Sequence, residues 1–104
     1  MKLMTKKLEN IFEKYPLYSQ DGEGSNAKVI AHYFMPFKNC HWFITEANRL
    51  ENGDYEMFGY CHISDGELGY VLFSDLKDTP YMERDMYYEP LTKTIKDFRE
   101  EYGI

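Results

Sequence analysis

The sequence predicts an α+β domain in which an antiparallel β-meander of four to five strands carries an N-terminal and a C-terminal helix. Three observations predict this fold: an apolar stripe with helical spacing at the start of the chain, a period of two with two hairpin signals in the middle, and a second helical stripe at the end. At 104 residues, the chain is expected to form one domain over residues 1–104.

The first helix is predicted from apolar residues that recur on one helical face. They fall at i, i+4, i+7, i+8 and i+11, and are Met4, Leu8, Ile11, Phe12 and Tyr15. Pro16 marks where this helix must end. The following residues 19–26 combine polar turn formers with two glycines, which predicts a mobile loop.

Two dipeptides in the middle of the chain are strong hairpin signals. Asn52-Gly53 lies between Leu50 and Tyr55, and Asp65-Gly66 lies between Ile63 and Leu68. Both dipeptides suit type I′ turns, which need positive φ at two successive residues. Together with a turn at residues 36–39, they predict strands at 28–35, 40–50, 55–64 and 67–73.

The register of this meander follows if each hairpin loop contains only those two residues, and Glu46 then lies opposite Gly59. One face is predicted to be the core under the helices, and collects Trp42, Ile44, Leu50, Tyr55, Met57, Cys61, Ile63, Leu68, Tyr70 and Leu72. The other face collects His41, Phe43, Thr45, Arg49, Glu56, Phe58, Tyr60, His62, Val71 and Phe73. This second face is too aromatic for an ordinary solvated surface, so it must be covered or used.

The last third of the chain predicts shorter elements. Ser74-Asp75-Leu76 is typical of the cap and first turn of a short helix, and residues 83–88 could form a fifth strand or an extended arm. Pro90 suits a first helical position. The apolar stripe of the terminal helix consists of Leu91, Ile95, Phe98 and Tyr102.

Composition and charge narrow the classes of function. The net charge is −6, and the acidic excess lies in the second half of the chain, which disfavours nucleic-acid binding and favours a basic protein partner.

The start of the chain lacks the apolar core of a signal peptide, and no segment is apolar enough to span a membrane, so a cytoplasmic location is expected. Cys40 and Cys61 are expected to be free thiols, and no motif predicts a cofactor.

Glu46 is the most informative candidate for a site. Alternation places its carboxylate on the otherwise apolar face, where it needs a partner. It could reach solvent or pair with Arg84, or it could be a desolvated acid or base; the structural role is the favoured one. Arg84, next to Asp85, could instead clamp an anionic ligand.

The aromatic face offers a second group of candidates. Phe43, Phe58 and Tyr60, with Phe73, could stack single-stranded bases, but this face has few basic residues, so a packed second layer is favoured. His32, His41 and His62 share this face without a clustered carboxylate, which indicates stacked or solvated side chains rather than a metal site. No serine or cysteine lies in a recognisable nucleophile motif.

The order of short motifs resembles a known family. These motifs are Pro16-Leu17-Tyr18-Ser19-Gln20, Trp42 with Ile44-Thr45-Glu46, Phe58-Gly59, Glu67-Leu68-Gly69-Tyr70, and Glu83-Arg84-Asp85 with Glu89-Pro90. Together they resemble domain of unknown function 2958, a family of short proteins of plasmids, phages and conjugative elements. The resemblance covers residues 16–90 and implies a mobile-element setting, but no catalytic residues. The acidic segment 21–24 departs from the family pattern.

Three functions are consistent with these patterns. The first is a non-enzymatic module that binds a protein partner through its acidic C-terminal half or its aromatic sheet face, with a homodimer also possible. The second is a small enzyme or ligand binder that uses Glu46 and Arg84 with Tyr70 or Tyr18. The third is nucleic-acid binding through the aromatic face.

Overall fold

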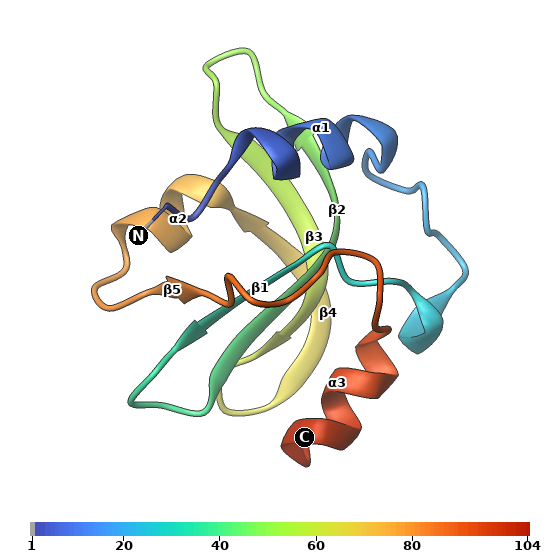
Figure 1. The fold of residues 1–104 in the computed structure, drawn as a ribbon, viewed down its shortest axis with the longest axis vertical. Helices are drawn as coiled ribbons and strands as arrows, with labels where there is room; N and C mark the ends of the chain where they lie inside the picture. Colours follow the sequence, from blue (N-terminus) through green and yellow to red (C-terminus); the bar gives the residue numbers. More distant parts are fainter. Residues whose placement is uncertain (1) are drawn as a thin grey trace.

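The computed structural model describes residues 2–104 and has an antiparallel sheet of five strands in the order β4-β3-β2-β1-β5 (Figure 1). The strands are β1 (Ala31–Met35), β2 (Cys40–Arg49), β3 (Tyr55–His62), β4 (Gly66–Leu72) and β5 (Glu83–Arg84). The helices are α1 (Lys6–Lys14), α2 (Phe73–Asp78), α3 (Ile95–Tyr102) and the short 3-10 helix η1 (Gly24–Asn26). The predicted α+β fold is therefore confirmed.

α1 and α2 cover one face of the sheet, which we call face A. The hydroxyl of Thr5 caps α1 by accepting a hydrogen bond from the N–H of Leu8, and Leu8 and Phe12 are buried. Their side chains join Leu76 of α2 in the main core against the sheet. The sheet side of this core includes Tyr33, Trp42, Ile44, Ala47 and Met57. The predicted first helix is confirmed, and it ends before Pro16.

α3 packs on the opposite face, which we call face B, and buries Ile95 and Phe98 there. It begins later than the predicted position at Pro90. The reason is that residues 91–94 are held by β-type contacts: the N–H of Leu91 donates to the carbonyl of Val29, and the N–H of Val29 donates to the carbonyl of Lys93. The helix starts only at Thr94, whose side chain forms a capping box with Asp97.

Neither hairpin has the predicted type I′ turn. The first loop is longer than two residues, since the N–H of Leu50 donates to the carbonyl of Asp54, and Gly53 has positive φ while Asn52 does not. In the second hairpin, His62 pairs with Gly66, so the loop holds residues 63–65 and Gly66 has no positive φ. The hairpins were predicted correctly, but their turn types were wrong.

The longer loop between β3 and β4 changes the register of these strands and therefore the face of the sheet on which each β4 side chain lies. Cys61 lies opposite Glu67 instead of Tyr70, so β4 is shifted by three residues relative to the prediction and its side chains lie on the opposite faces. Val71 and Phe73 pack against the face A core rather than on the aromatic face. Leu68, Tyr70 and Leu72 instead lie on face B, where they are 47%, 54% and 37% exposed.

A β-bulge in β2 changes the position of Glu46. Ile44 pairs with Gly59 and Glu46 with Phe58, so Thr45 is the extra residue on β2. Glu46 is consequently on face B opposite Phe58, and its predicted position on the core face opposite Gly59 was wrong. A Cβ at Gly59 would overlap the carbonyl oxygen of Phe43, so the close approach of the strands at the bulge requires glycine.

The fifth strand is shorter than the predicted segment 83–88. Glu83 and Arg84 pair with Phe34 and Tyr33 of β1, and the N–H of the following Asp85 donates to the carbonyl of His32. No helix among residues 2–104 combines the length and the apolar character that a membrane span needs.

Gly59→Ala should destabilise the protein strongly, because the added methyl group meets backbone atoms that cannot move aside. Overpacking of this kind costs about 1–3 kcal/mol, so the urea midpoint should fall clearly. The matched control is Gly69→Ala, since Gly69 pairs directly with Gly59 across β3 and β4 but has nothing within 4 Å of an added Cβ. Equal effects of the two substitutions would contradict the account of the bulge.

Candidate functional site

Glu46 is a buried carboxylate that binds main-chain N–H groups. It is 4% exposed, and its two oxygens accept hydrogen bonds from the N–H of Tyr18 at 2.7 Å and of Gln20 at 2.8 Å. The suggested ion pair with Arg84 does not form, since Arg84 lies on β5 and its Nε donates to the carbonyl of Lys2. The polar partners of Glu46 are therefore the main chain of the segment after α1.

The segment after α1 is tied to the sheet at several further points. The N–H of Leu17 donates to Oδ1 of Asn48 at 2.9 Å. The side chain of Gln20 donates to the carbonyls of Lys28 and Thr45, and it accepts the N–H of Lys28 at 2.7 Å. These contacts give a fixed path to residues for which the sequence predicted a mobile loop.

Tyr18 is held in a left-handed backbone conformation with φ of 75°, which is uncommon for a residue with a bulky side chain. Such a conformation costs about 1–3 kcal/mol and persists where neighbouring contacts impose it. The hydrogen bond from its N–H to Glu46 is one such contact. Its side chain is 66% exposed.

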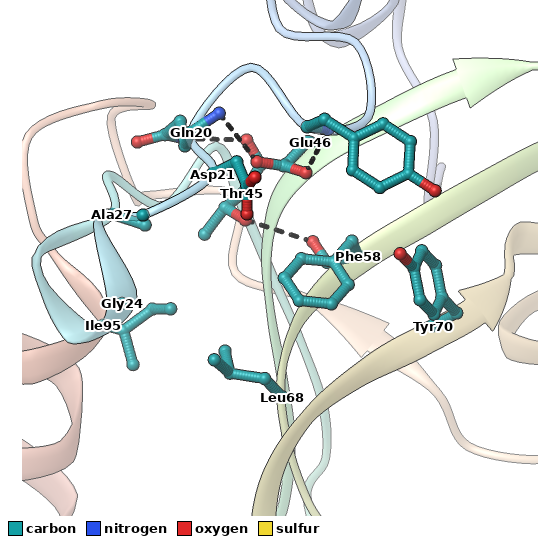
Figure 2. Close-up of a pocket in the computed structure, with 12 residues that line it drawn as sticks. Gln20, Asp21, Gly24, Ala27, Thr45, Glu46, Phe58, Leu68, Tyr70 and Ile95 are labelled. Carbon is teal, nitrogen blue, oxygen red and sulfur yellow. Dashed lines mark hydrogen bonds between the residues drawn. The ribbon is translucent and has the colours of Figure 1, made fainter.

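A cavity of about 300 Å³ opens between this segment and strands β3 and β4 (Figure 2). Its apolar walls include Ala27, Phe58, Leu68 and Ile95. Its polar lining comes from Gln20, Asp21, Thr45 and Glu46, and Tyr18 and Tyr70 also line it. The cavity therefore combines aromatic and aliphatic walls with two carboxylates.

The electrostatic character of this cavity is negative. Its lining contains Asp21 and Glu46 but no lysine, arginine or histidine. The pKa of Tyr70 is raised, first by the neighbouring side chain of Tyr18, then by desolvation, and further by the negative charges of Glu56 and Glu46. An anionic ligand would therefore be repelled, whereas a cationic group would be attracted.

The structure brings together only part of the predicted site. Glu46, Phe58 and Tyr70 line the same cavity. Phe43 and Tyr60 are buried in the second core under α3. Arg84 and Asp85 line a different hollow, between α1 and residues 86–90.

Gln20 and Asp21 are cavity residues that the sequence reasoning missed. The sequence linked these two residues to the site only indirectly. Glu46 needed hydrogen-bond donors, and a polar turn segment can supply main-chain N–H groups. Because those donors belong to the backbone, no residue type in the segment marks them.

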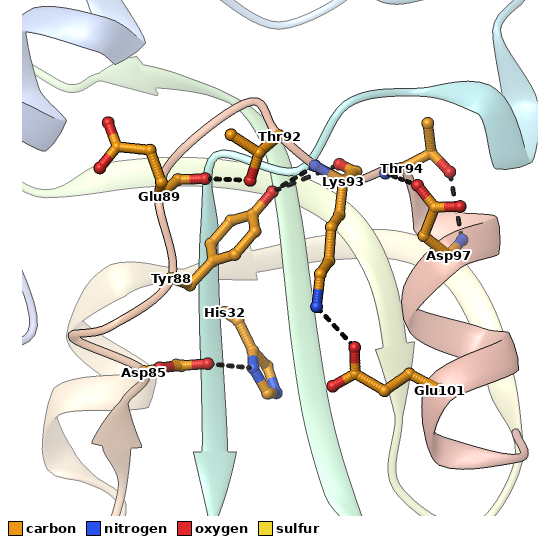
Figure 3. Close-up of polar contacts among 9 residues, drawn as sticks. All are labelled: His32, Asp85, Tyr88, Glu89, Thr92, Lys93, Thr94, Asp97 and Glu101. Carbon is orange, nitrogen blue, oxygen red and sulfur yellow. Dashed lines mark hydrogen bonds and ion pairs between the residues drawn. The ribbon is translucent and has the colours of Figure 1, made fainter.

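A second polar cluster lies under α3. The side chain of His32 is 1% exposed, and its Nε2 lies 2.8 Å from Nδ1 of His41, whose Nε2 lies 3.0 Å from Oδ1 of Asn39. On its other side, Nδ1 of His32 is 3.7 Å from a carboxylate oxygen of Asp85, as Figure 3 shows. The rings of Phe43 and Phe98 also pack around His32.

The buried histidine pair is held neutral by its surroundings. Burial, and then the neighbouring His41, lower the pKa of His32 to about 4. Burial, and then His62, also lower the pKa of His41. Within residues 2–104, no three histidine, cysteine or acidic side chains gather in an arrangement that could hold a metal ion.

Polar contacts from residues 88–101 fix α3 on face B (Figure 3). The hydroxyl of Tyr88 donates to the carbonyl of Val29 at 2.7 Å and accepts the N–H of Lys93 at 3.1 Å. The Nζ of Lys93 pairs with Glu101 at 2.6 Å. These contacts position Ile95, which forms one wall of the cavity.

The cavity lining holds few side chains of the types that act as nucleophiles. Its lining has no serine, cysteine or histidine, and the hydroxyl of Thr45 donates to the carbonyl of Phe58. Cys61 lies outside it, and burial raises the pKa of that thiol to about 11, which keeps it protonated at neutral pH.

Compared with known proteins, the chain matches no family model, and no similar protein was found among the curated proteins or the solved structures. The resemblance to domain of unknown function 2958, and the mobile-element setting that it implies, stay predictions.

Glu46→Gln should loosen the segment after α1. The amide keeps one acceptor oxygen but turns an NH₂ group toward a backbone N–H, so one hydrogen bond is lost in a buried place. The free energy of unfolding should fall by about 1–3 kcal/mol, measured by urea denaturation. Glu67→Gln, which neutralises an exposed acid on β4, is the control and should have little effect. No difference between the two variants would argue against the role of Glu46.

The protein should lose stability as the pH falls from about 6.5 to about 4. His32 has a pKa of about 4 when folded and 6.5 when unfolded, so the unfolded chain binds a proton first on acidification. His32 contributes on the order of 3 kcal/mol above pH 6.5, and this contribution disappears as the pH falls through the folded pKa. Urea denaturation over this pH range should show a steeper loss for the wild type than for His32→Phe. Parallel pH profiles would contradict the assignment.

Proposed function

We propose that this protein is a non-enzymatic binding module that holds an extended segment of a partner protein on the part of face B that α3 leaves uncovered. We call this part the open strip, and it consists of Phe58, Leu68, Tyr70 and Leu72. The exposure of large apolar side chains along β4 is the observation that carries the proposal. A row of this kind is typical of a surface that meets a partner.

The open strip is arranged on two neighbouring strands. Tyr70 lies opposite Phe58 and Leu68 opposite Tyr60, so the apolar side chains of β4 form one continuous row with those of β3. The rings of Phe58 and Tyr70 are 4.9 Å apart between centroids. An extended segment at the edge of β4 would place every second side chain beside this row, on the same face of the sheet.

β4 also offers a free edge to a partner strand. It is the terminal strand of the sheet formed by the described residues, so its outer edge pairs with no other strand of that sheet. Its register with β3 runs without a bulge from Leu72 to Gly66, and it carries a single charged residue, Glu67. Edge strands that avoid pairing usually carry bulges, prolines or several charges. This edge therefore suits strand addition, in which main-chain hydrogen bonds provide affinity.

Charge favours a basic segment as the partner. Glu56 lies opposite Leu72 beside the open strip, and Asp21 and Glu46 line the adjoining cavity. The net charge of −6 adds a long-range attraction for a basic chain and a repulsion for phosphate groups. This supports a protein partner over a nucleic acid.

The rival proposal of a small enzyme or ligand binder has less support. It retains Glu46 and Tyr70, which line one cavity with Tyr18, but it loses Arg84, which lines another hollow. Without Arg84, the cavity has no cationic group with which to hold an anionic substrate.

Linear peptides selected from a random library should bind the full chain at the open strip and should combine apolar with basic residues. Leu68→Ser and Tyr70→Ser should each weaken a selected peptide at least about tenfold, since truncation of a central contact costs roughly 1–2 kcal/mol or more. Isothermal titration calorimetry measures this change.

Tyr87→Ser is the matched control, because Tyr87 is 93% exposed and lies outside the open strip. It should leave the affinity unchanged. The proposal would be overturned if no peptide were selected, or if the affinity were insensitive to Leu68→Ser and Tyr70→Ser. It would also be overturned if β4 paired with a second copy instead, which sedimentation would detect as a dimer that Leu68→Ser dissociates.

A further inference from the structure

We propose that the cavity beside the open strip receives a lysine or arginine side chain of the bound segment. The proposal rests on the proposed function, because it names the side chain that a partner on β4 would insert. It is carried by the combination of apolar walls, unopposed carboxylates and aromatic rings in one cavity.

The lining of the cavity matches the two parts of such a side chain. Phe58, Leu68 and Ile95 offer apolar surface to an aliphatic stem, and Asp21 and Glu46 lie with Thr45 at the other side (Figure 2). Long cationic side chains place their methylene groups on apolar surface and their charged end among polar groups. A purely apolar side chain would leave the carboxylates without a counter-charge.

The two carboxylates have no cationic partner within the described part of the chain. Glu46 is almost fully buried, and its hydrogen bonds come from two neutral main-chain N–H groups. Asp21 forms no side-chain hydrogen bond or ion pair among residues 2–104. A cation that enters the cavity would meet both charges, and the attraction to Glu46 is stronger than in open water because that carboxylate is almost fully buried.

The aromatic rings add a second attraction for a cation. Tyr18, Phe58 and Tyr70 all line the cavity, and a cation that contacts the face of an aromatic ring is attracted to its π-electrons. The position of Tyr18 depends on Glu46, which binds its N–H while the backbone has positive φ. The acid that lines the cavity thus also helps to position one of the rings that line it.

The cavity is continuous with the open strip. Phe58, Leu68 and Tyr70 belong to both, so a segment paired with β4 would carry alternate side chains past the entrance. One of these side chains can enter the cavity while its neighbours on the same face cover Tyr70 and Leu72. This places the cationic residue in register with the apolar residues of the segment.

The test uses the full chain and two small probes, N-acetyl-arginine amide and N-acetyl-citrulline amide. Citrulline has nearly the same shape as arginine but no charge, so the pair isolates the role of the cation. NMR titration should show saturable shifts of the ring signals of Tyr18, Phe58 and Tyr70 with the arginine probe. The citrulline probe should bind about tenfold more weakly, because without a charge it forms no ion pair or charge-assisted hydrogen bond with the carboxylates.

Asp21→Asn should weaken the arginine probe about threefold, as expected for a partly exposed charge pair. Asp65→Asn is the control, because Asp65 is an exposed acid in the turn between β3 and β4, outside the cavity. Equal binding of both probes, absence of saturable shifts, or equal effects of the two substitutions would overturn the proposal.

Failure here is distinguishable from failure of the proposed function. If selected peptides still bind the open strip and lose no affinity when their lysine and arginine residues are replaced by norleucine and citrulline, only the assignment of the cavity is wrong. If no peptide binds the open strip, the binding function itself is wrong.

Discussion

The bulge at Thr45 is the constraint on which the candidate site depends. In an unbroken strand, Glu46 would share a face with Ile44, which packs in the main core. The extra residue turns Glu46 to face B, where its carboxylate can reach the N–H groups of Tyr18 and Gln20. Without this turn, a carboxylate would lie among apolar side chains at a cost of several kcal/mol.

The bulge also determines the course of the chain between α1 and β1. Glu46 and the carbonyl of Thr45 both bind Gln20, one through its main chain and the other through its side chain. Residues 18–24 therefore run beside β3 and β4, and the cavity forms in the space between them. Gly59 completes the arrangement, because a larger residue would force β3 away from Phe43 at the bulge.

The secondary structure could be predicted because it depends on local patterns. The stripe from Met4 to Tyr15 and the stop at Pro16 specify α1 without reference to the rest of the chain. Register was not predictable in the same way, since it depends on loop length. A three-residue loop at 63–65 instead of two residues was enough to turn Leu68, Tyr70 and Leu72 from the expected core face to face B. No residue type in the sequence indicated the bulge, because threonine is common in regular strands.

The sequence indicated the candidate site only through one unusual residue, a carboxylate among apolar side chains. Glu46 stood out as a carboxylate in an apolar row, and it does line the cavity, yet the suggested cationic partner was wrong because backbone groups satisfy it. The surplus of aromatic residues is likewise evident in the sequence, but its division between a buried and an open part depends on the register and on the length of α3.

This division follows from the size of α3. The helix has eight residues, and its buried side chains, Ile95 and Phe98, cover Phe43 and Tyr60 but do not extend over the outer half of β4. The covered half is packed so closely that two histidines stay neutral within it, while the open half leaves large apolar side chains in water. A chain that can bury aromatic residues so completely on one half of a face has the means to bury the other half. This contrast between the two halves of face B supports the proposal that the open strip is a surface kept for a partner.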